Sequence, residues 1–377
     1  MPSRKRLTLA AIILMSLPAL AEDHHHRIPK RIVADYTSGA KFLNPPYSAA
    51  QIPYHKLTHI IHAGIPWNSD GSLSIQDGFV EPDLIRKAHA HGVKVMLLTG
   101  GDFAAIEASE QVFNTVLANL KAFVTTNDYD GLDVDWEFPS DSTDRAFFVT
   151  LMRRLRETFP SPRYTLSVDI APWNGDFYNL DKLKTQLDFF NLMVYDCAGP
   201  WTSMGHLNSA IFWDNRDPHP EECQPGGSDQ QAAELYLKHV PARQLNIGTP
   251  FYGYDYTNVT GLFGACPNAP STPDGFCDNT VQAMGYGPNI KKLINKEGWV
   301  RHYDSASLVP YLVRKDGGPG FITYDDAFST YARVHYADWD LGLGGTFMWS
   351  LDADYDGHSQ DLLDAMYQAT IDGKHKH

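Results

Sequence analysis

The stretch Asp130-Gly-Leu-Asp-Val-Asp-Trp-Glu-Phe-Pro139 alternates acidic and apolar residues. Three of its four acids, Asp133, Asp135 and Glu137, share one parity; the residues between and before these three are Leu132, Val134 and Trp136. Successive side chains of a strand point to opposite faces, so the three carboxyls would project in one direction at intervals of about 6–7 Å. The pattern predicts a strand over residues 131–137 whose apolar face is covered by other parts of the fold.

A one-sided row of acids needs a chemical explanation, because burying like carboxyls costs free energy unless protons or hydrogen bonds compensate. Two structural alternatives are a solvated edge strand and a calcium site. An edge strand would not need an apolar opposite face, and a calcium loop would show glycine and oxygen ligands in a turn. The arrangement favours catalysis in which one carboxyl stays protonated near neutral pH and delivers its proton.

Short apolar runs alternate with helical patterns along most of the chain. The expected strands cover residues 31–36, 57–65, 93–99, 131–137, 164–170, 189–196, 244–249 and 345–350. Helical stretches lie between them, and examples are residues 81–91, 107–126, 142–159, 230–240 and 329–339. Eight strand–helix units predict an α/β fold, a (β/α)8 TIM barrel. Its active site would open at the C-terminal ends of the strands, where Glu137 stands.

The interval between the seventh and eighth strands does not follow this alternation. It carries glycines, prolines, two cysteines, a candidate helix over residues 288–297 and short strand-like runs. We predict a small α+β insertion at about residues 255–320. Long segments over the C-terminal face of a barrel commonly shape the substrate cleft.

The N-terminal segment has the layout of a secretory signal peptide. Three cations, Arg4, Lys5 and Arg6, precede an apolar stretch over residues 7–17 and the small-residue site Ala19-Leu-Ala21. That stretch is shorter than the roughly 20 residues that span a membrane. We therefore predict a leader over residues 1–21 and a secreted, extracellular catalytic barrel over residues 22–377, with no membrane association.

The charge of the chain limits its partners. The formal net charge is −14, and removing the three leader cations leaves about −17. An acidic surface argues against nucleic acid and anionic membranes, and fits a neutral polymer. Asn258-Val-Thr260 is a glycosylation sequon, which leaves the modification itself undecided.

The four cysteines suit an exported protein. Of the three possible connectivities we favour the sequential one, with Cys197 joined to Cys223 and Cys266 joined to Cys277. Their spacing is too wide and irregular for a zinc site, and the histidines at residues 24–26 and at the C-terminus belong to chain ends. We expect neither a metal nor a cofactor.

The acidic stretch resembles the Asp-x-x-Asp-x-Asp-x-Glu signature of family 18 glycoside hydrolases, the chitinases. Further matches follow in the order of that family: Thr99-Gly100-Gly101, Met193-Val-Tyr195-Asp196, Phe251-Tyr252-Gly253 and Trp349. The segments Ala198-Gly-Pro-Trp201 and Gly205-His206-Leu-Asn208 are similar to a loop of fungal members with long clefts. The resemblance extends from about Ile32 to Tyr367, nearly the whole mature chain.

The resemblance implies a mechanism without a protein nucleophile, in which the N-acetyl oxygen of the substrate attacks the anomeric carbon. Glu137 would act as the acid and then the base, and Asp135 would hold the acetamido group. Asp133 would share a proton with Asp135 and so modulate it. Tyr195 and Asp196 would contact the acetamido oxygen and the distorted sugar.

The same resemblance implies a set of substrate-binding residues. Trp349 would form the apolar surface beneath the sugar, and the other members are Tyr36, Trp136, Met193, Trp201, Tyr252, Gly100 and Gly101. The implied substrate is chitin or N-acetylglucosamine oligosaccharides, hydrolysed by a protein that acts as a monomer. The alternatives left open are an endoglycosidase on N-linked glycans and a non-catalytic chitin-binding lectin or effector.

This chain departs from the family pattern away from the proposed acid. Asp102-Phe103 stands where many relatives have a tryptophan, Tyr254 replaces a frequent arginine, and Phe138 replaces a common tyrosine. His62-Ala63-Gly64 replaces the usual aromatic pattern. These departures concern the outer parts of the cleft, and leave exo or endo action, processivity and biological role undecided.

Overall fold

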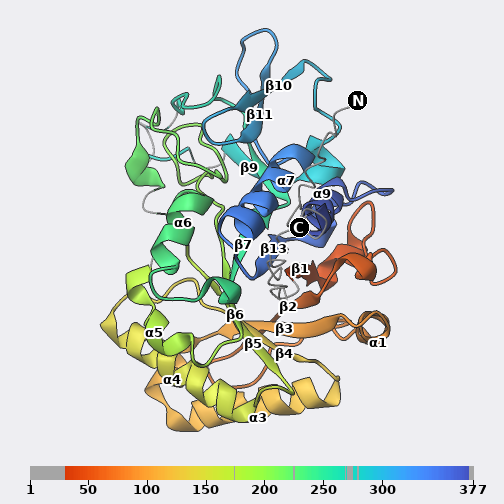
Figure 1. Ribbon diagram of the computed structural model, residues 1–377, viewed down its shortest axis with the longest axis vertical. Coiled ribbons are helices and arrows are strands. Elements are labelled where there is room, and N and C mark those ends of the chain that lie inside the picture. Colours follow the sequence, from red (N-terminus) through yellow and green to blue (C-terminus); the bar gives the residue numbers. More distant parts are fainter. Residues whose placement is uncertain are drawn as a thin grey trace, which may run out of the picture.

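Eight parallel strands close on themselves into a barrel in the order β1-β13-β7-β6-β5-β4-β3-β2 (Figure 1). They are β1 (Arg31–Thr37), β2 (His59–Trp67), β3 (Lys94–Gly101), β4 (Gly131–Asp135), β5 (Thr165–Ile170), β6 (Phe189–Leu192), β7 (Leu245–Pro250) and β13 (Gly345–Trp349). This computed structural model describes residues 30–173, 175–223, 226–267, 269, 275–277 and 280–372. It confirms the predicted TIM barrel; the predicted leader and the histidines at the chain ends lie outside the described residues.

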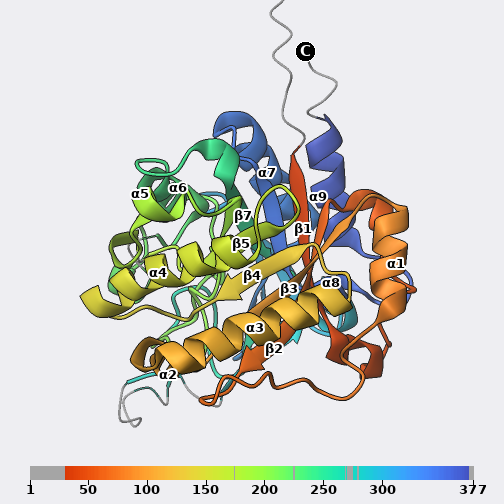
Figure 2. The ribbon, with the colours of Figure 1, turned by 90° about the horizontal axis from the view of Figure 1, so that it is seen from below.

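Helices cover the outside of the barrel, and Figure 2 shows α3 and α4 lying along β4. They are α1 (Pro82–Ala90), α2 (Phe103–Ala108), α3 (Glu110–Thr126), α4 (Ser142–Thr158), α5 (Leu180–Leu183), α6 (Asp229–Tyr236), α7 (Ala327–His335), α8 (Leu351–Asp354) and α9 (Asp361–Asp372). The helix predicted over residues 107–126 is divided, because Ser109 leaves the helical conformation and its side chain accepts a hydrogen bond from the Val112 amide. No described helix has the length and apolar character that crossing a bilayer requires.

The insertion between β7 and β13 contains an antiparallel sheet, seen at the end of the molecule opposite α3 and α4 (Figure 1). Its strands are β8 (Tyr252–Tyr256), β9 (Val281–Gly285), β10 (Trp299–Asp304), β11 (Val309–Arg314) and β12 (Phe321–Thr323). The insertion was predicted, but its helix over residues 288–297 was wrong. A π-helix covers Tyr286–Ile290 instead, and the backbone at Asn295 and Glu297 is left-handed, with φ of 55° and 52°, which does not continue a right-handed helix.

Two disulfides join Cys197 to Cys223 and Cys266 to Cys277, as predicted. The first ties the segment after β6 to a later part of the same long connection. The second lies within the insertion.

The interior of the barrel is divided into an apolar part and a polar part. The apolar part contains Val33, Ile61, Ala63, Met96, Leu98, Phe189 and Phe347. The polar part comes from β1, β4, β5, β6 and β7, and its buried members are Asp35, Asp133, Ser167, Asp169, Asn191 and Asn246. Buried polar groups are costly without partners, so this second part is organised by hydrogen bonds.

Two strands end two or more residues before their predicted ends, which places the residues after them over the mouth of the barrel. β4 ends at Asp135 and β6 at Leu192, rather than at residues 137 and 196. After β6 the Val194 and Tyr195 amides donate to the carbonyls two residues back, at 2.9 and 2.8 Å, and Asp196 has a φ of 63°. These local turns replace the ladder hydrogen bonds that would have continued the strand.

Candidate active site

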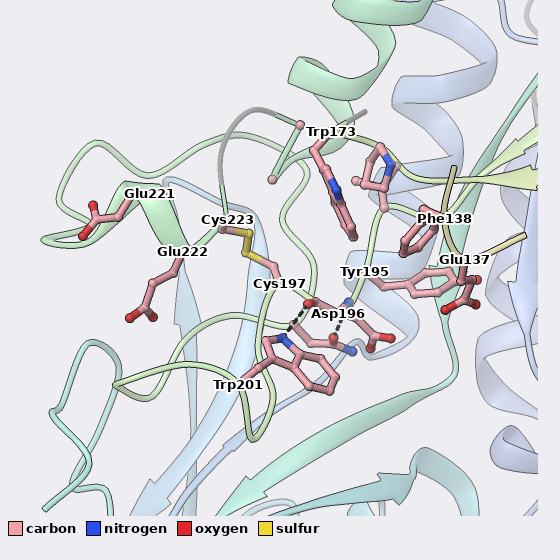
Figure 3. Close-up of a pocket in the computed structure, with 15 residues that line it drawn as sticks. Glu137, Phe138, Trp173, Tyr195, Asp196, Cys197, Trp201, Glu221, Glu222 and Cys223 are labelled. Carbon is pink, nitrogen blue, oxygen red and sulfur yellow. Dashed lines mark hydrogen bonds between the residues drawn. A yellow bond between two sulfur atoms is a disulfide. The ribbon is translucent and has the colours of Figure 1, made fainter. Parts of the chain in front are cut away.

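A continuous cleft crosses the C-terminal ends of the barrel strands. Its central cavity is lined by Asp135, Glu137, Phe138, Asp169, Trp173, Met193, Tyr195, Asp196, Tyr252 and Trp349. One neighbouring cavity shares Glu137 and Asp196 with it and extends to Trp201 and the Cys197–Cys223 disulfide. Another shares Trp349 and extends to Pro45 and Tyr355. Figure 3 shows Glu137, Tyr195 and Asp196 close together in the first neighbouring cavity, with Glu221 and Glu222 at some distance from them.

The acidic strand delivers a graded series of carboxyls into this cleft. Asp133 is fully buried, Asp135 is half-buried, and Glu137, beyond the end of β4, is the most exposed of the three. The carboxyls of Asp135 and Glu137 are hydrogen-bonded to each other, which requires a proton between them. Burial, and then the negative charge of Glu137, raise the pKa of Asp135 to about 7. The pair therefore retains one proton up to near-neutral pH.

Glu137 is positioned to give or take that proton at the cleft. Its pKa is raised by partial burial and by the charge of Asp196, and lowered in part by the hydrogen bond from Asp135. Two acids in contact titrate as a unit, so the proton belongs to the pair and is available at the exposed member. This is the arrangement that proton donation to a leaving group requires.

Asp133 makes its hydrogen bonds across the barrel, to β5 and β6. Its Oδ2 accepts from the Ser167 hydroxyl and from Asn191 Nδ2, the latter at 3.1 Å. A further hydrogen bond joins it to the carboxyl of Asp169. The direct bonds of Asp133 thus run to neighbouring strands, and Asp135 acts on it through its charge.

Asp196 is held by two tyrosines from the start of the insertion. Its Oδ1 accepts from the hydroxyl of Tyr252 and, at 2.8 Å, from that of Tyr254. Its amide donates to Asn208 Oδ1 at 2.9 Å. Tyr254, one of the departures from the family pattern, therefore orients a predicted site residue, and Asn208 does the same through the backbone.

The aromatic residues predicted to bind substrate lie at different depths. Trp349 and Tyr252 line the central cavity with Tyr195 and Met193. Trp201 stands further out, 42% exposed, and its Nε1 donates to the Asp196 carbonyl at 3.1 Å (Figure 3). Trp173, a second tryptophan able to stack on a sugar, is 40% exposed and borders both the central cavity and the Trp201 cavity.

The structure places Tyr36 elsewhere, which corrects the prediction that it binds substrate. Its side chain packs in the layer between barrel and helices, and its hydroxyl donates to the Glu81 carboxylate at 3.1 Å. The outward residues of β1 are Ile32, Ala34 and Tyr36, so the intervening Asp35 is the one that points into the barrel.

Gly100 and Gly101 allow neighbouring strands to approach closely, because they have no side chain. A Cβ on Gly100 would lie 2.5 Å from the Asp135 carbonyl oxygen, and one on Gly101, whose φ is 141°, would lie 2.3 Å from that of Trp67. Gly101 also borders a side cavity with Phe103 and Trp136. There the Trp136 ring stacks on Phe103, with centroids 4.2 Å apart and planes 4° apart.

Sequence reasoning missed two buried acids of the site, Asp35 and Asp169. Each is a single acid at an inward position of an otherwise apolar run, Val33-Ala-Asp-Tyr36 and Val168-Asp-Ile170. The available signal was an acid inside an otherwise apolar run. Asp169 stands directly opposite Asp135 in the register of β4 and β5.

Among the described residues, one group brings together three side chains of metal-ligand type, Cys197, His206 and Cys223. The two sulfurs are joined in a disulfide, and His206 Nε2 bonds to Asp217 at 2.7 Å. These atoms are therefore already engaged with protein partners.

Comparisons with known proteins agree with this geometry. The family model described as glycosyl hydrolases family 18 matches residues 33–354. A probable endochitinase of Caenorhabditis elegans is 32% identical over 266 residues, which are 67% of this chain and 41% of that protein. Chitinase 1 of Aphanocladium album is 26% identical over 343 residues, 81% of this chain and 72% of the relative. The structure of Ostrinia furnacalis Group IV chitinase in complex with allosamidin has a TM-score of 0.78 at 21% identity, covering 91% of this chain and 99% of that one, a likeness of fold.

Proposed function

The chain belongs to glycoside hydrolase family 18, and from this premise we propose that it is a secreted chitinase that hydrolyses β-1,4 bonds between N-acetylglucosamine units. The observation that carries the proposal is the proton-sharing pair of Asp135 and Glu137, which lines the central cavity together with Tyr195 and Trp349. The chain spans 41% of the C. elegans relative and 72% of the A. album one. Because these relatives are longer, the activity is proposed from the site of this chain and is not carried over from them.

Glu137 would be the proton donor. It is the exposed end of the carboxyl pair, so a glycosidic oxygen in the central cavity can reach it, and the raised pKa of Asp135 behind it keeps one proton on the pair at working pH. After the glycosidic bond breaks, the carboxylate of Glu137 would take a proton from a water molecule while the oxygen of that water attacks the anomeric carbon and displaces the acetamido oxygen, so the proton returns to the pair. The same residue thus acts first as acid and then as base.

The nucleophile would be the acetamido oxygen of the sugar. The acids that line the cavity are Asp135, Glu137, Asp169 and Asp196. Asp196 is already engaged with the protein, because its Oδ1 accepts two tyrosine hydroxyls. An intramolecular attack needs no protein nucleophile and gains from proximity. Asp135 would hold the acetamido N–H and stabilise the positive intermediate, and Tyr195 would bind the acetamido oxygen, so the anomeric configuration is retained.

The walls of the cleft fit a polymer of pyranose rings. Trp349 offers a flat apolar surface in the central cavity, Trp173 and Trp201 border one side, and Tyr355 borders the other. Aromatic faces combine large apolar contact with few rotatable bonds. The two neighbouring cavities would hold the sugars on either side of the bond that is cleaved.

We extend the proposal to localisation. Residues 1–21 would direct export and be removed, and one catalytic unit would follow from residue 22. The two disulfides support an oxidising destination.

The test is product analysis from the hexamer of N-acetylglucosamine, with the Glu137→Gln variant alongside. Shorter oligomers from the wild type and none from the variant would support the proposal. Binding of the hexamer without shortening would indicate a lectin, and release of glycans from a glycoprotein with intact hexamer would indicate an endoglycosidase; either result would overturn it.

A further inference from the structure

A line of hydrogen bonds with a fixed direction runs through the polar part of the barrel. Arg31 Nε donates to Asn246 Oδ1 at 3.0 Å, Asn246 Nδ2 donates to Asn191 Oδ1 at 2.8 Å, and Asn191 Nδ2 ends the line at two carboxyls. A guanidinium can only donate. The orientation of each amide is therefore set by the arginine, and the amino group of Asn191 must face the acids.

Asn191 thereby bridges Asp133 and Asp169. Its Nδ2 lies 3.1 Å from Asp133 Oδ2 and 2.9 Å from Asp169 Oδ1. The two carboxyls come from adjacent strands, and they are hydrogen-bonded to each other as well. Both are buried, with exposed fractions of 0% and 3%.

The buried acids outnumber the donors that reach them. Among the described residues no donor reaches Asp133 Oδ1, Asp135 Oδ1 or either oxygen of Asp35. The titratable groups around Asp169 are Asp35 from β1, Asp133, Asp135 and Glu137 from β4 and its end, Tyr178 from the segment after β5, and Tyr195 from the segment after β6. None of these groups is a cation. Protons shared between Asp133 and Asp169, and between Asp135 and Glu137, therefore supply hydrogen bonds that these donors do not.

We propose that Asp169 is a positioning residue of the reaction: it shares a proton with Asp133, and so leaves the proton of Asp135 to Glu137. Asp133 and Asp135 stand on the same face of β4, two residues apart, where an unshared Asp133 carboxylate would attract the proton of Asp135. Asp169 and Asn191 engage Asp133 from the side, and the Asp135–Glu137 pair remains intact. The expected effect on kcat rests on the proposed function, whereas the proton shared by Asp169 and Asp133 rests on the hydrogen bonds alone.

The kinetic test compares Asp169→Ala with Asp169→Asn. Alanine removes the carboxyl that shares a proton with Asp133. We therefore expect kcat to fall by about tenfold or more while KM stays within about twofold, because the change affects proton transfer rather than ground-state binding. The alkaline limb of the kcat/KM profile should also move upward, since an ionised, unshared Asp133 favours the protonated form of Asp135. Asparagine can accept from Asn191 and donate to Asp133, and should restore kcat to within about threefold.

Asp354→Asn is the matched control. Asp354 is as deeply buried, and burial raises its pKa to about 7, but it accepts the Leu362 and Leu363 amides at the start of α9. Its kcat and pH profile should equal those of the wild type. An Asp169→Ala enzyme with unchanged kcat, a loss of kcat without movement of the alkaline limb, or an asparagine variant as impaired as the alanine variant would each overturn the proposal.

A second measurement needs neither activity nor the alanine variant. The infrared spectrum of the wild type minus that of Asp169→Asn, at neutral pH without substrate, should contain a protonated-carboxyl C=O band from the shared pair. Absence of that band would overturn the proposal. If the wild type cleaves no oligomer, the proposed function fails, and the infrared difference still decides whether Asp169 shares a proton.

Discussion

The carboxyls beneath the cleft and the tryptophans along its rim differ in how much solvent reaches them. Asp133 and Asp169 are 0% and 3% exposed, whereas Trp173 and Trp201 are 40% and 42% exposed. We call the first group, with Asp135, the floor and the two tryptophans the rim. Asn191 of β6 donates to floor residues on two further strands, Asp133 of β4 and Asp169 of β5, whereas among the described residues the Trp201 side chain makes one hydrogen bond, to a backbone carbonyl.

This difference predicts how each region fails when it is changed. A floor residue acts on protons, so its loss should change kcat and the pH profile. A rim residue contributes contact area equally to the bound substrate and the transition state, so its loss should change KM. The variants below would either sharpen that division or break it.

The largest effect is expected at the point where floor and cleft meet. Glu137→Gln keeps the shape of the side chain and removes the transferable proton, so kcat for the hexamer should fall by about 10³-fold with little change in hexamer affinity. Initial rates and equilibrium binding measure the two quantities. Glu110→Gln, at the exposed start of α3, serves as the control and should retain full activity. A Glu137→Gln enzyme within tenfold of wild type would remove Glu137 from the role of proton donor.

Asp135→Asn should separate catalysis from stability. The amide cannot hold the shared proton, so kcat should fall by about 10²-fold. The folded-state pKa of Asp135, about 7, lies above the unfolded value, so ionising this carboxyl costs stability as pH rises towards 7 and the full cost is present above it. The variant should therefore melt above the wild type at pH 8, and this gain should vanish near pH 4. A lower Tm at pH 8 would show that the charge of Asp135 stabilises the floor.

The pH profile of the wild type tests the same pair without a substitution. Loss of the proton of the Asp135–Glu137 pair should reduce kcat/KM on the alkaline side with an apparent pKa of about 7. Above that value the rate should fall about tenfold per pH unit. Hydrolysis of an oligomer at low concentration from pH 4 to 9 gives the profile. A rate that rises steadily through pH 8 would contradict a protonated pair as the active form.

Some carboxyls of the site could be predicted from the sequence and others could not. Asp133, Asp135 and Glu137 were identified because three acids at one parity of an apolar strand have few structural explanations, and the barrel followed from eight alternating units. Asp169 was missed because its partners stand on β4 and β6, and only the register that sets Asp169 opposite Asp135 reveals the contact. Sequence parity shows that two residues share a face, but not which other strand they meet.

The error at Tyr36 has a related cause. Both parities of β1 are buried, so the sequence does not distinguish the inward face from the outward one. Barrel closure against β2 and β13 makes that choice, and it turns Asp35 inward. The early ends of β4 and β6 were likewise beyond reach, because a local turn such as the one before Asp196 depends on where the next segment must pass.

The smallest effect is expected at the rim. Trp201→Ala removes an exposed ring from the outer cavity, so KM for the hexamer should rise by about three- to tenfold, while kcat stays within about twofold. The ring has a second function, since its Nε1 bonds to the Asp196 carbonyl. Trp201→Phe keeps an aromatic face and removes that bond, and it should have a KM close to that of the wild type if stacking is what matters. A fall in kcat in both variants would mean that Trp201 supports Asp196 and, through it, the reaction centre, and the division between floor and rim would not hold at this residue.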